Sequence, residues 1–122
     1  MAATILIAED DRSLQKILGI VVSRLKLEST SVSDGQAVLD ELAKGGYDLV
    51  LLDLLMPKVD GLEVLRQMRE RGDKTPVIVL SNLDSDDDIA TAKKFGAKQY
   101  IIKSNISLVY IREVIAATLA GN

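Results

Sequence analysis

Chemically capable side chains follow four of the apolar runs in this sequence. Asp53 comes directly after the run Leu49–Leu52, and three acidic residues (EDD, 9–11) come directly after a run near the N-terminus. Ser81 and Lys103 follow two further apolar runs. A carboxylate among buried apolar residues is costly unless a cation or a hydrogen-bond donor pairs with it. The placement of Asp53 therefore requires partners from elsewhere in the chain.

The residue types that are present restrict the chemistry of such a cluster. The 122 residues include no histidine and no cysteine, which excludes disulfides, thiolate metal sites, cysteine nucleophiles and the commonest general base. Two carboxylates about 4 Å apart repel by roughly 4 kcal/mol at an effective dielectric constant of 20, so clustered carboxylates imply a cation or raised pKa values. An all-oxygen site favours Mg²⁺, because calcium requires a richer oxygen cage and no EF-hand pattern is present.

The elements that must position these groups alternate along the chain. Apolar runs predict strands at residues 4–8, 28–32, 48–53, 76–80 and 98–102, the second of them polar enough for a sheet edge. Apolar residues at helical spacing predict a helix after each strand. Asp11 or Ser13 could cap the first helix. Asp34 and Gly35 predict a turn before the second helix.

Five such units predict a parallel sheet covered by helices on both sides, because the third and fourth strands are apolar on both faces. We expect one α/β domain over residues 1–122, a flavodoxin-like, doubly wound (βα)5 fold with strand order 2-1-3-4-5. The topological switch then lies between strands one and three, and ligands bind there, outside the carboxyl ends of the strands. The acidic residues, the hydroxyl and the amine would converge at this edge.

A carboxylate beside a magnesium ion, with an ammonium opposite, can attack a phosphoryl group and become an aspartyl phosphate. Catalysis requires that the nucleophile lie in line and that the charge on the transferring oxygens be neutralised. The metal and Lys103 would supply positive charge, and Ser81 could donate a hydrogen bond to a phosphoryl oxygen. Asp53 would be the nucleophile, fixed at a rigid strand end.

The chain resembles the receiver domain of bacterial response regulators over essentially its whole length. The resemblance is carried by the segments ILIAEDD, YDLVLLDLLMPKVDGLEVLRQMR and TPVIVLSNLDSDDDIATAKKFGAKQYIIK and by the closing helix. It implies a phosphorelay domain that catalyses only its own phosphorylation and dephosphorylation. It also implies Mg²⁺, a histidine kinase or histidine phosphotransferase as donor, and a docking face for a downstream protein. The donor must act in trans, because this chain has no histidine.

The resemblance also assigns roles to individual residues. Asp53 is the phospho-acceptor and Lys103 the essential lysine. Glu9 and Asp10 form the acidic pair, with Asp10 the direct magnesium ligand, which leaves Asp11 as a helix cap. Leu55 would give the metal its backbone carbonyl.

The resemblance assigns the conformational switch to Ser81 and Tyr100. Serine after a strand is also ordinary turn chemistry, and Tyr100 could equally be a half-buried aromatic residue in a strand. Family members usually carry proline, often after a cis bond, where this chain has Ser104. A cis bond before a non-proline residue costs about 2.5–4 kcal/mol, so we expect none at this position.

Two apolar residues occupy positions at which the family tunes the lifetime of the phosphoryl group. Leu55 lies two residues after the acceptor, and Leu83 lies two residues after the switch hydroxyl. We hypothesise that both side chains exclude attacking water and lengthen the lifetime. The acidic residues 84–88, by contrast, predict a solvated helix start and not a second metal site.

The sequence gives weaker support to other functional classes. The net charge is −3 without a basic block, so we expect no nucleic-acid binding by this domain. Neither a signal peptide nor an apolar run of about 20 residues is present, so we expect a cytoplasmic protein that does not enter a membrane.

One alternative is a constitutive protein-binding module that keeps the receiver fold without phosphoryl turnover. A nucleotide binder is disfavoured because the chain lacks G-x-G-x-x-G and Walker motifs. Ile106 and Tyr110 could be docking residues, although partial burial explains them equally well.

Overall fold

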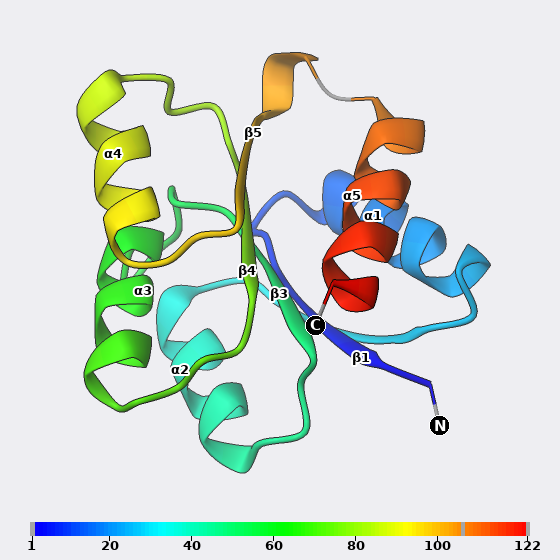
Figure 1. The fold of residues 1–122 in the computed structure, drawn as a ribbon, viewed down its shortest axis with the longest axis horizontal. Coiled ribbons are helices and arrows are strands. Elements are labelled where there is room, and N and C mark those ends of the chain that lie inside the picture. The colour runs from blue at the N-terminus through cyan, green and yellow to red at the C-terminus, as the bar shows by residue number, and fades with distance from the viewer. Residues whose placement is uncertain (1, 106, 122) are drawn as a thin grey trace.

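The computed structural model describes residues 2–105 and 107–121, which form one sheet with helices on both faces (Figure 1). The strands are β1 (Thr4–Ala8), β2 (Glu28–Val32), β3 (Leu49–Leu52), β4 (Val77–Ser81) and β5 (Gln99–Ile102). The helices are α1 (Arg12–Arg24), α2 (Gly35–Lys44), α3 (Gly61–Glu70), α4 (Asp86–Lys94) and α5 (Leu108–Ala120), and a 3-10 turn η1 (Lys103–Asn105) follows β5. Each predicted strand is present, with its ends within one residue of the prediction. No helix in the described ranges is long and apolar enough to cross a membrane.

The strands pair in parallel in the order β2-β1-β3-β4-β5, which confirms the predicted flavodoxin-like topology. The register places Ala8 of β1 beside Leu52 of β3, and Leu52 beside Val79 of β4. The carboxyl ends of the central strands therefore meet at one edge of the sheet. The polar strand β2 lies at the border of the sheet, as its composition predicts.

The sheet separates two apolar cores. Helices α1 and α5 cover one face, and α2, α3 and α4 cover the other (Figure 1). Alternate residues of β1 and β3 point into the two cores: Ile5, Ile7, Leu49 and Leu51 into the first, and Leu6, Ala8, Val50 and Leu52 into the second. Strand β3 is buried on both faces, which explains why its sequence has no polar alternation.

Side-chain caps fix where the helices begin. Asp11 Oδ1 accepts hydrogen bonds from the amides two and three residues further on, so Asp11 and not Ser13 is the N-cap of α1. Asp34 Oδ1 accepts a hydrogen bond from the amide of Ala37, which makes Asp34 the cap of α2. The prediction of a separate turn there was wrong, because this cap places Gly35 in the first turn of the helix.

Candidate functional site

The predicted acidic residues meet where β1 and β3 end. Glu9 follows β1 and Asp53 follows β3, and the amide of Asp53 donates a hydrogen bond to the carbonyl oxygen of Ala8 at 3.0 Å. Carboxylate oxygens of Glu9, Asp10 and Asp53 lie within 4.8 Å of one another. Glu9 is 1% exposed and Asp53 is 4% exposed, whereas Asp10 is open to solvent. The edge therefore presents two buried carboxylates and one accessible carboxylate.

The ammonium group of Lys103 lies against both buried carboxylates. Its Nζ is 2.6 Å from Glu9 Oε1 and 2.7 Å from Asp53 Oδ2. Only 14% of the side chain is exposed, so Lys103 is not a surface lysine. It follows β5, which is separated from β3 by β4, and its long side chain spans that distance. The fold thus uses an unbranched cation to reach the acidic edge from a distant strand.

Burial and pairing act against each other on the ionisation of these groups. Burial raises the pKa of the Glu9 carboxyl, and the Lys103 ammonium and the Asp11 amide offset only part of that rise. For Lys103, burial acts to lower the pKa, but the hydrogen bonds and charges of Asp53 and Glu9 outweigh it and raise the pKa. Lys103 is therefore held in its charged form by the two carboxylates.

The geometry of the acidic edge fits a small, hard cation. Glu9 Oε1 is buried, and the group that faces it is the Lys103 ammonium, with which it forms an ion pair. Glu9 and Asp53 share the single ammonium of Lys103, and Asp10 adds a third carboxylate, so the edge keeps an excess of negative charge. The donor atoms are all oxygens, which Mg²⁺ prefers. Among the residues that the structure describes, these three form the acidic group that could hold a metal.

Leu55 contacts the acceptor through its backbone. Its amide donates a hydrogen bond to Asp53 Oδ1 at 3.1 Å, while its side chain is 54% exposed above the edge. Asp53 therefore has one oxygen held by Lys103 and the other held by this amide. The metal-ligand role of the Leu55 carbonyl stays a prediction.

Ser81 and Tyr100 lie on β4 and β5 and both contact the segment that follows β4. Ser81 is fully buried at the end of β4, and its Oγ accepts a hydrogen bond from the amide of Leu83 at 3.3 Å. Tyr100 packs against the core on the side of α2, α3 and α4, and its hydroxyl donates to the Leu83 carbonyl oxygen at 2.6 Å. Burial, followed by the negative charge of Asp88, raises the pKa of Tyr100. Both residues therefore share one loop, and the switch role of each stays a prediction.

The remaining sequence expectations near the site can also be located. The described peptide bonds include no cis bond, so the bond between Lys103 and Ser104 is trans, as expected. The acidic residues Asp86, Asp87 and Asp88 lie in the first turn of α4, where the positive end of the helix dipole favours them. This placement agrees with a solvated helix start.

Gln15 is a site neighbour that the sequence did not single out. Its amide Nε2 donates to the carbonyl oxygens of Glu9 at 2.9 Å and Val32 at 3.2 Å, and it lies 3.4 Å from Ser33 Oγ. These contacts tie α1 to the loop that carries the acidic pair. Polar residues are frequent in the first turns of a helix, so nothing in the sequence marks this one.

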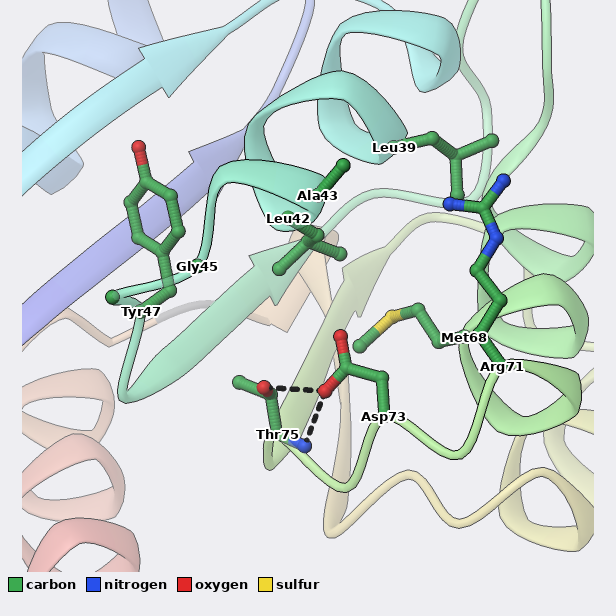
Figure 2. A pocket seen from close by; sticks show the side chains of 10 residues that line it. Leu39, Leu42, Ala43, Gly45, Tyr47, Met68, Arg71, Asp73 and Thr75 are labelled. Carbon is green, nitrogen blue, oxygen red and sulfur yellow. Dashed lines mark hydrogen bonds between the residues drawn. The ribbon is translucent and has the colours of Figure 1, made fainter.

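A cavity of about 360 Å³ lies away from the acidic residues (Figure 2). Residues before β3 and before β4 line it, so it belongs to the opposite edge of the sheet. Its Asp73 carboxylate accepts hydrogen bonds from the amide and hydroxyl of Thr75, at 2.9 and 2.6 Å (Figure 2). This carboxylate is therefore used within its own loop and takes no part in the candidate site.

Fold and site together define a doubly wound domain with a cluster of three carboxylates and a paired lysine at its topological switch. Residues 5–115 match the family described as the response regulator receiver domain, and the chain belongs to this family. It is a receiver domain of two-component signalling, with a CheY-like fold, and not a classical enzyme. Receiver domains of this class work with histidine kinases.

Curated relatives support this membership. The uncharacterized transcriptional regulatory protein YkoG of Bacillus subtilis is 40% identical over 99 residues, which are 81% of this chain and 43% of that protein. The sensory transduction protein RegX3 of Mycobacterium tuberculosis is 38% identical over 118 residues, which are 97% of this chain and 52% of that protein. The chain thus spans about half the length of these relatives or less.

Solved structures share the fold. The receiver domain of the Francisella response regulator 1452 is 26% identical with a TM-score of 0.91, and the match covers 98% of each chain. A CheY-like receiver domain protein from Methanospirillum hungatei has a TM-score of 0.93, covering 99% of this chain and 96% of that one. Its identity is only 20%, so this second likeness bears on the fold alone.

Proposed function

We propose that this domain, over residues 1–122, accepts a phosphoryl group on Asp53 from a phosphohistidine of a kinase or phosphotransferase. The observation that carries the proposal is the buried Asp53 carboxylate, 2.7 Å from Lys103 Nζ and clustered with Glu9 and Asp10. Family membership supports a cytoplasmic location with a histidine kinase as partner.

The residues at this edge suit Mg²⁺ as the resident ion. Asp10 and Asp53 would hold it directly, with the Leu55 carbonyl as a third ligand and Glu9 close by. When bound, the ion neutralises negative charge on the acceptor and on the transferring oxygens. The exposure of Asp10 leaves this side of the cluster open to solvent and to a donor.

The chain itself supplies the nucleophile and its orientation. An oxygen of Asp53 forms the new O–P bond as the P–N bond of the donor breaks, and the electron pair of that bond stays on the imidazole nitrogen of the donor. Lys103 and the Leu55 amide hold the two Asp53 oxygens in place before attack, which lowers the entropic part of the barrier. Lys103 can also pair with the negative charge of the transferred group.

Phosphorylation would be read out through Ser81 and Tyr100. The product carries more negative charge and more acceptor oxygens than the carboxylate. The Ser81 side chain can turn and donate its hydroxyl proton to such an oxygen, and this turn would break the hydrogen bond that its Oγ now accepts from the Leu83 amide. That exchange would shift the loop whose carbonyl accepts the Tyr100 hydroxyl, and with it a protein-docking face near β5.

Incubation with acetyl phosphate, followed by intact mass spectrometry, tests the proposal. We expect a magnesium-dependent gain of one phosphoryl group in the wild type and no gain in Asp53→Asn. Asp87→Asn, an exposed acid on α4, is the matched control and should be modified like the wild type. Equal modification of Asp53→Asn and wild type would contradict the assignment of the acceptor.

The second candidate is a constitutive binding module that keeps the receiver fold without phosphoryl turnover. The acidic cluster argues against it, because such a module gains nothing from three neighbouring carboxylates. Magnesium binding separates the two. At a concentration 100 times its Kd, the ion should stabilise the fold by about 2.7 kcal/mol, and Asp10→Asn should lose most of this. A melting temperature that does not respond to Mg²⁺ at matched ionic strength would favour the binding module.

A further inference from the structure

The two acidic residues that follow β1 are held in different ways. The amide of Glu9 donates to the carbonyl oxygen of Val32 at 3.0 Å, and its Oε2 accepts a hydrogen bond from the amide of Asp11 at 3.0 Å. Its Oε1 lies 2.6 Å from Lys103 Nζ. Its own carbonyl oxygen accepts a hydrogen bond from Nε2 of Gln15 at 2.9 Å. Glu9 is therefore fixed through both its backbone and its side chain.

Asp10, by contrast, has an exposed side chain. Its carboxylate forms no ion pair with any residue that the structure describes, although it belongs to the acidic group that could hold a metal. The direction of this side chain therefore depends on the backbone that carries it. The carbonyl oxygen of Glu9 lies in the peptide plane that joins Glu9 to Asp10, and a peptide unit is rigid. A hydrogen bond that fixes this oxygen thus fixes the plane from which the Asp10 side chain projects.

Gln15 supplies that hydrogen bond from the start of α1. Its side-chain amide carries two N–H donors, and three oxygens surround it: the carbonyl oxygens of Glu9 at 2.9 Å and Val32 at 3.2 Å, and Ser33 Oγ at 3.4 Å. The Val32 carbonyl oxygen also accepts the amide of Glu9. One partly buried side chain thus joins the end of β2 to the peptide inside the acidic pair.

The packing of α1 on the sheet rests on other residues. Leu18, Val21 and Val22 are the buried residues of this helix, and they belong to the core on the side of α1 and α5. The hydrogen bonds of Gln15 are instead with polar atoms at the strand ends. Loss of its N–H donors should therefore loosen the acidic loop while the helix keeps its place.

Gln15 also differs from the exposed apolar residues of the same helix. Ile17 and Ile20 are 40% and 54% exposed, and Tyr110 of α5 is 48% exposed. Ile106, the other docking residue suggested by the sequence, lies outside the described residues. Because the hydrogen-bond partners of Gln15 lie at the strand ends, a substitution of Gln15 leaves this apolar surface unchanged.

From these contacts we propose that Gln15 is a positioning residue for the metal site. It holds the peptide between Glu9 and Asp10 so that the Asp10 carboxylate faces Asp53 before an ion arrives. Gln15 acts through this peptide and contacts neither the ion nor the phosphoryl group. Removal of a group that holds a metal ligand in place commonly lowers metal affinity by roughly 10–100-fold. The inference rests on the proposed function, because it takes Mg²⁺ as the ion of this site.

Removal of the donors without a change in charge tests this role. Gln15→Met has a side chain of similar length but no N–H group. In isothermal titration calorimetry without any phosphoryl donor, we expect Mg²⁺ to bind this variant roughly tenfold more weakly than the wild type. The melting temperature without Mg²⁺ should fall by only about 4–8 °C, as expected for the loss of partly buried hydrogen bonds.

Two further variants complete the comparison. Gln36→Met makes the same substitution in the first turn of α2, where the Gln36 side-chain amide donates to Asp40 Oδ1 at 3.0 Å. This variant should bind Mg²⁺ like the wild type. Gln15→Asn keeps the amide but shortens the side chain by one carbon, so it should weaken Mg²⁺ binding in the same direction as Gln15→Met. Gln15→Asn also carries the test if Gln15→Met does not fold.

The dependence of the modification rate on Mg²⁺ separates positioning from direct action on the phosphoryl group. With acetyl phosphate as donor, the Mg²⁺ concentration that gives half of the maximal rate should rise roughly tenfold in Gln15→Met. The rate at saturating Mg²⁺ should stay within about twofold of the wild type, because the bound ion then holds Asp10 in place.

Three results would overturn the proposal. These are an unchanged Mg²⁺ affinity in both Gln15 variants, an equal loss of affinity in Gln36→Met, or a rate that stays low at saturating Mg²⁺. None of them contradicts phosphorylation of Asp53 in the wild type. A folded wild type that binds no Mg²⁺ in calorimetry would instead contradict the proposed function, and the role of Gln15 would fall with it.

Discussion

Asp53 is a buried carboxylate in an unbalanced set of charges. It shares a single ammonium with Glu9, while Asp10 adds a third negative charge at the same edge. Removing one partner of a buried ion pair lowers the free energy of unfolding by roughly 3–5 kcal/mol, because the other charge is left uncompensated. The edge is therefore poised to take up positive charge, and this property connects the fold to the proposed reaction.

Sequence reasoning found the identities of these residues and placed Lys103 opposite the carboxylates, but it could not say which carboxylate oxygens the ammonium contacts. The apolar run before Asp53 and the acids after β1 could be read directly from the chain. That Lys103 reaches both Glu9 and Asp53 depends on the side-chain conformation of a lysine two strands away. The three hydrogen-bond contacts of Gln15 likewise depend on how α1 lies against the ends of β1 and β2. Such contacts are set by tertiary packing, which local patterns do not encode.

We hypothesise that two side chains near the acceptor set the lifetime of the phosphoryl group. Leu55 is 54% exposed beside Asp53, and Leu83 is partly buried in the loop that follows Ser81. If both exclude water, the double variant Leu55→Asn, Leu83→Lys should shorten the half-life of the phosphorylated domain by about tenfold, or about 1.4 kcal/mol in activation free energy. The measurement is the decay of the phosphorylated mass after acetyl phosphate is removed. An unchanged half-life in the double variant would contradict the hypothesis.

At the scale of elements, close contact between α3 and the end of β3 fixes the acceptor. A Cβ added at Gly61 would lie 2.5 Å from the carbonyl oxygen of Asp53 and 2.7 Å from the Cα of Leu54. Because both are backbone atoms, α3 would have to move away from the strand. Gly61→Ala should destabilise the fold by about 1–3 kcal/mol in chemical denaturation and slow the modification by acetyl phosphate.

Gly19 provides the matched control for that substitution. It lies inside α1, and an added Cβ would meet nothing within 4 Å. Gly19→Ala should therefore stabilise the domain by up to about 1 kcal/mol and leave the modification rate unchanged. Equal stability changes in the two variants would show that the contact between Gly61 and the acceptor does not constrain the strand end.

The order of the elements was predictable from the sequence because strand and helix patterns alternate without a break. Composition alone distinguishes a central strand from an edge strand here. Leu49–Leu52 is entirely apolar, whereas Glu28–Val32 is mostly polar. The helix starts were harder to define. The pair Asp34 and Gly35 is typical both of a turn and of a helix N-cap. The hydrogen bond from the Ala37 amide to Asp34 Oδ1 shows that Asp34 is an N-cap.

Helix α3 also carries a surface ion pair with a defined pH dependence. The hydrogen bond from Arg66, followed by that from Gln67, lowers the pKa of Glu63 to about 2. Because the pKa is lower in the folded state, the stabilisation is complete above pH 4.5 and disappears as the pH falls toward 2. Glu63→Gln should melt at a lower temperature than the wild type at pH 7, with a difference that narrows over that window and in high salt.

Glu113→Gln serves as the control for this titration. Glu113 is exposed on α5 and forms no ion pair with the residues that the structure describes. Its melting temperature should follow that of the wild type across the same pH range. If the melting temperature of Glu63→Gln stays below that of the wild type at pH 2, the variant has lost packing contacts and not only a charge.

At the scale of the whole molecule, one sheet separates two apolar cores. The carboxyl edge holds the acidic site, the face covered by α2, α3 and α4 holds Tyr100 and Leu83, and helices α1 and α5 cover the opposite face. Every central strand contributes side chains to both cores, so the sheet is a rigid partition. This division predicts where motion is confined when the site is modified.

Hydrogen exchange measures that confinement directly. After treatment with acetyl phosphate and Mg²⁺, protection should change in residues 82–85 and in β5, because Ser81 and Tyr100 both contact the loop after β4. Amides of α1 should keep their exchange rates, since they pack on the other side of the sheet. Asp53→Asn under the same conditions separates the effect of the phosphoryl group from that of the metal. Equal changes in α1 and β5 would show that the sheet transmits the effect of phosphorylation to both faces.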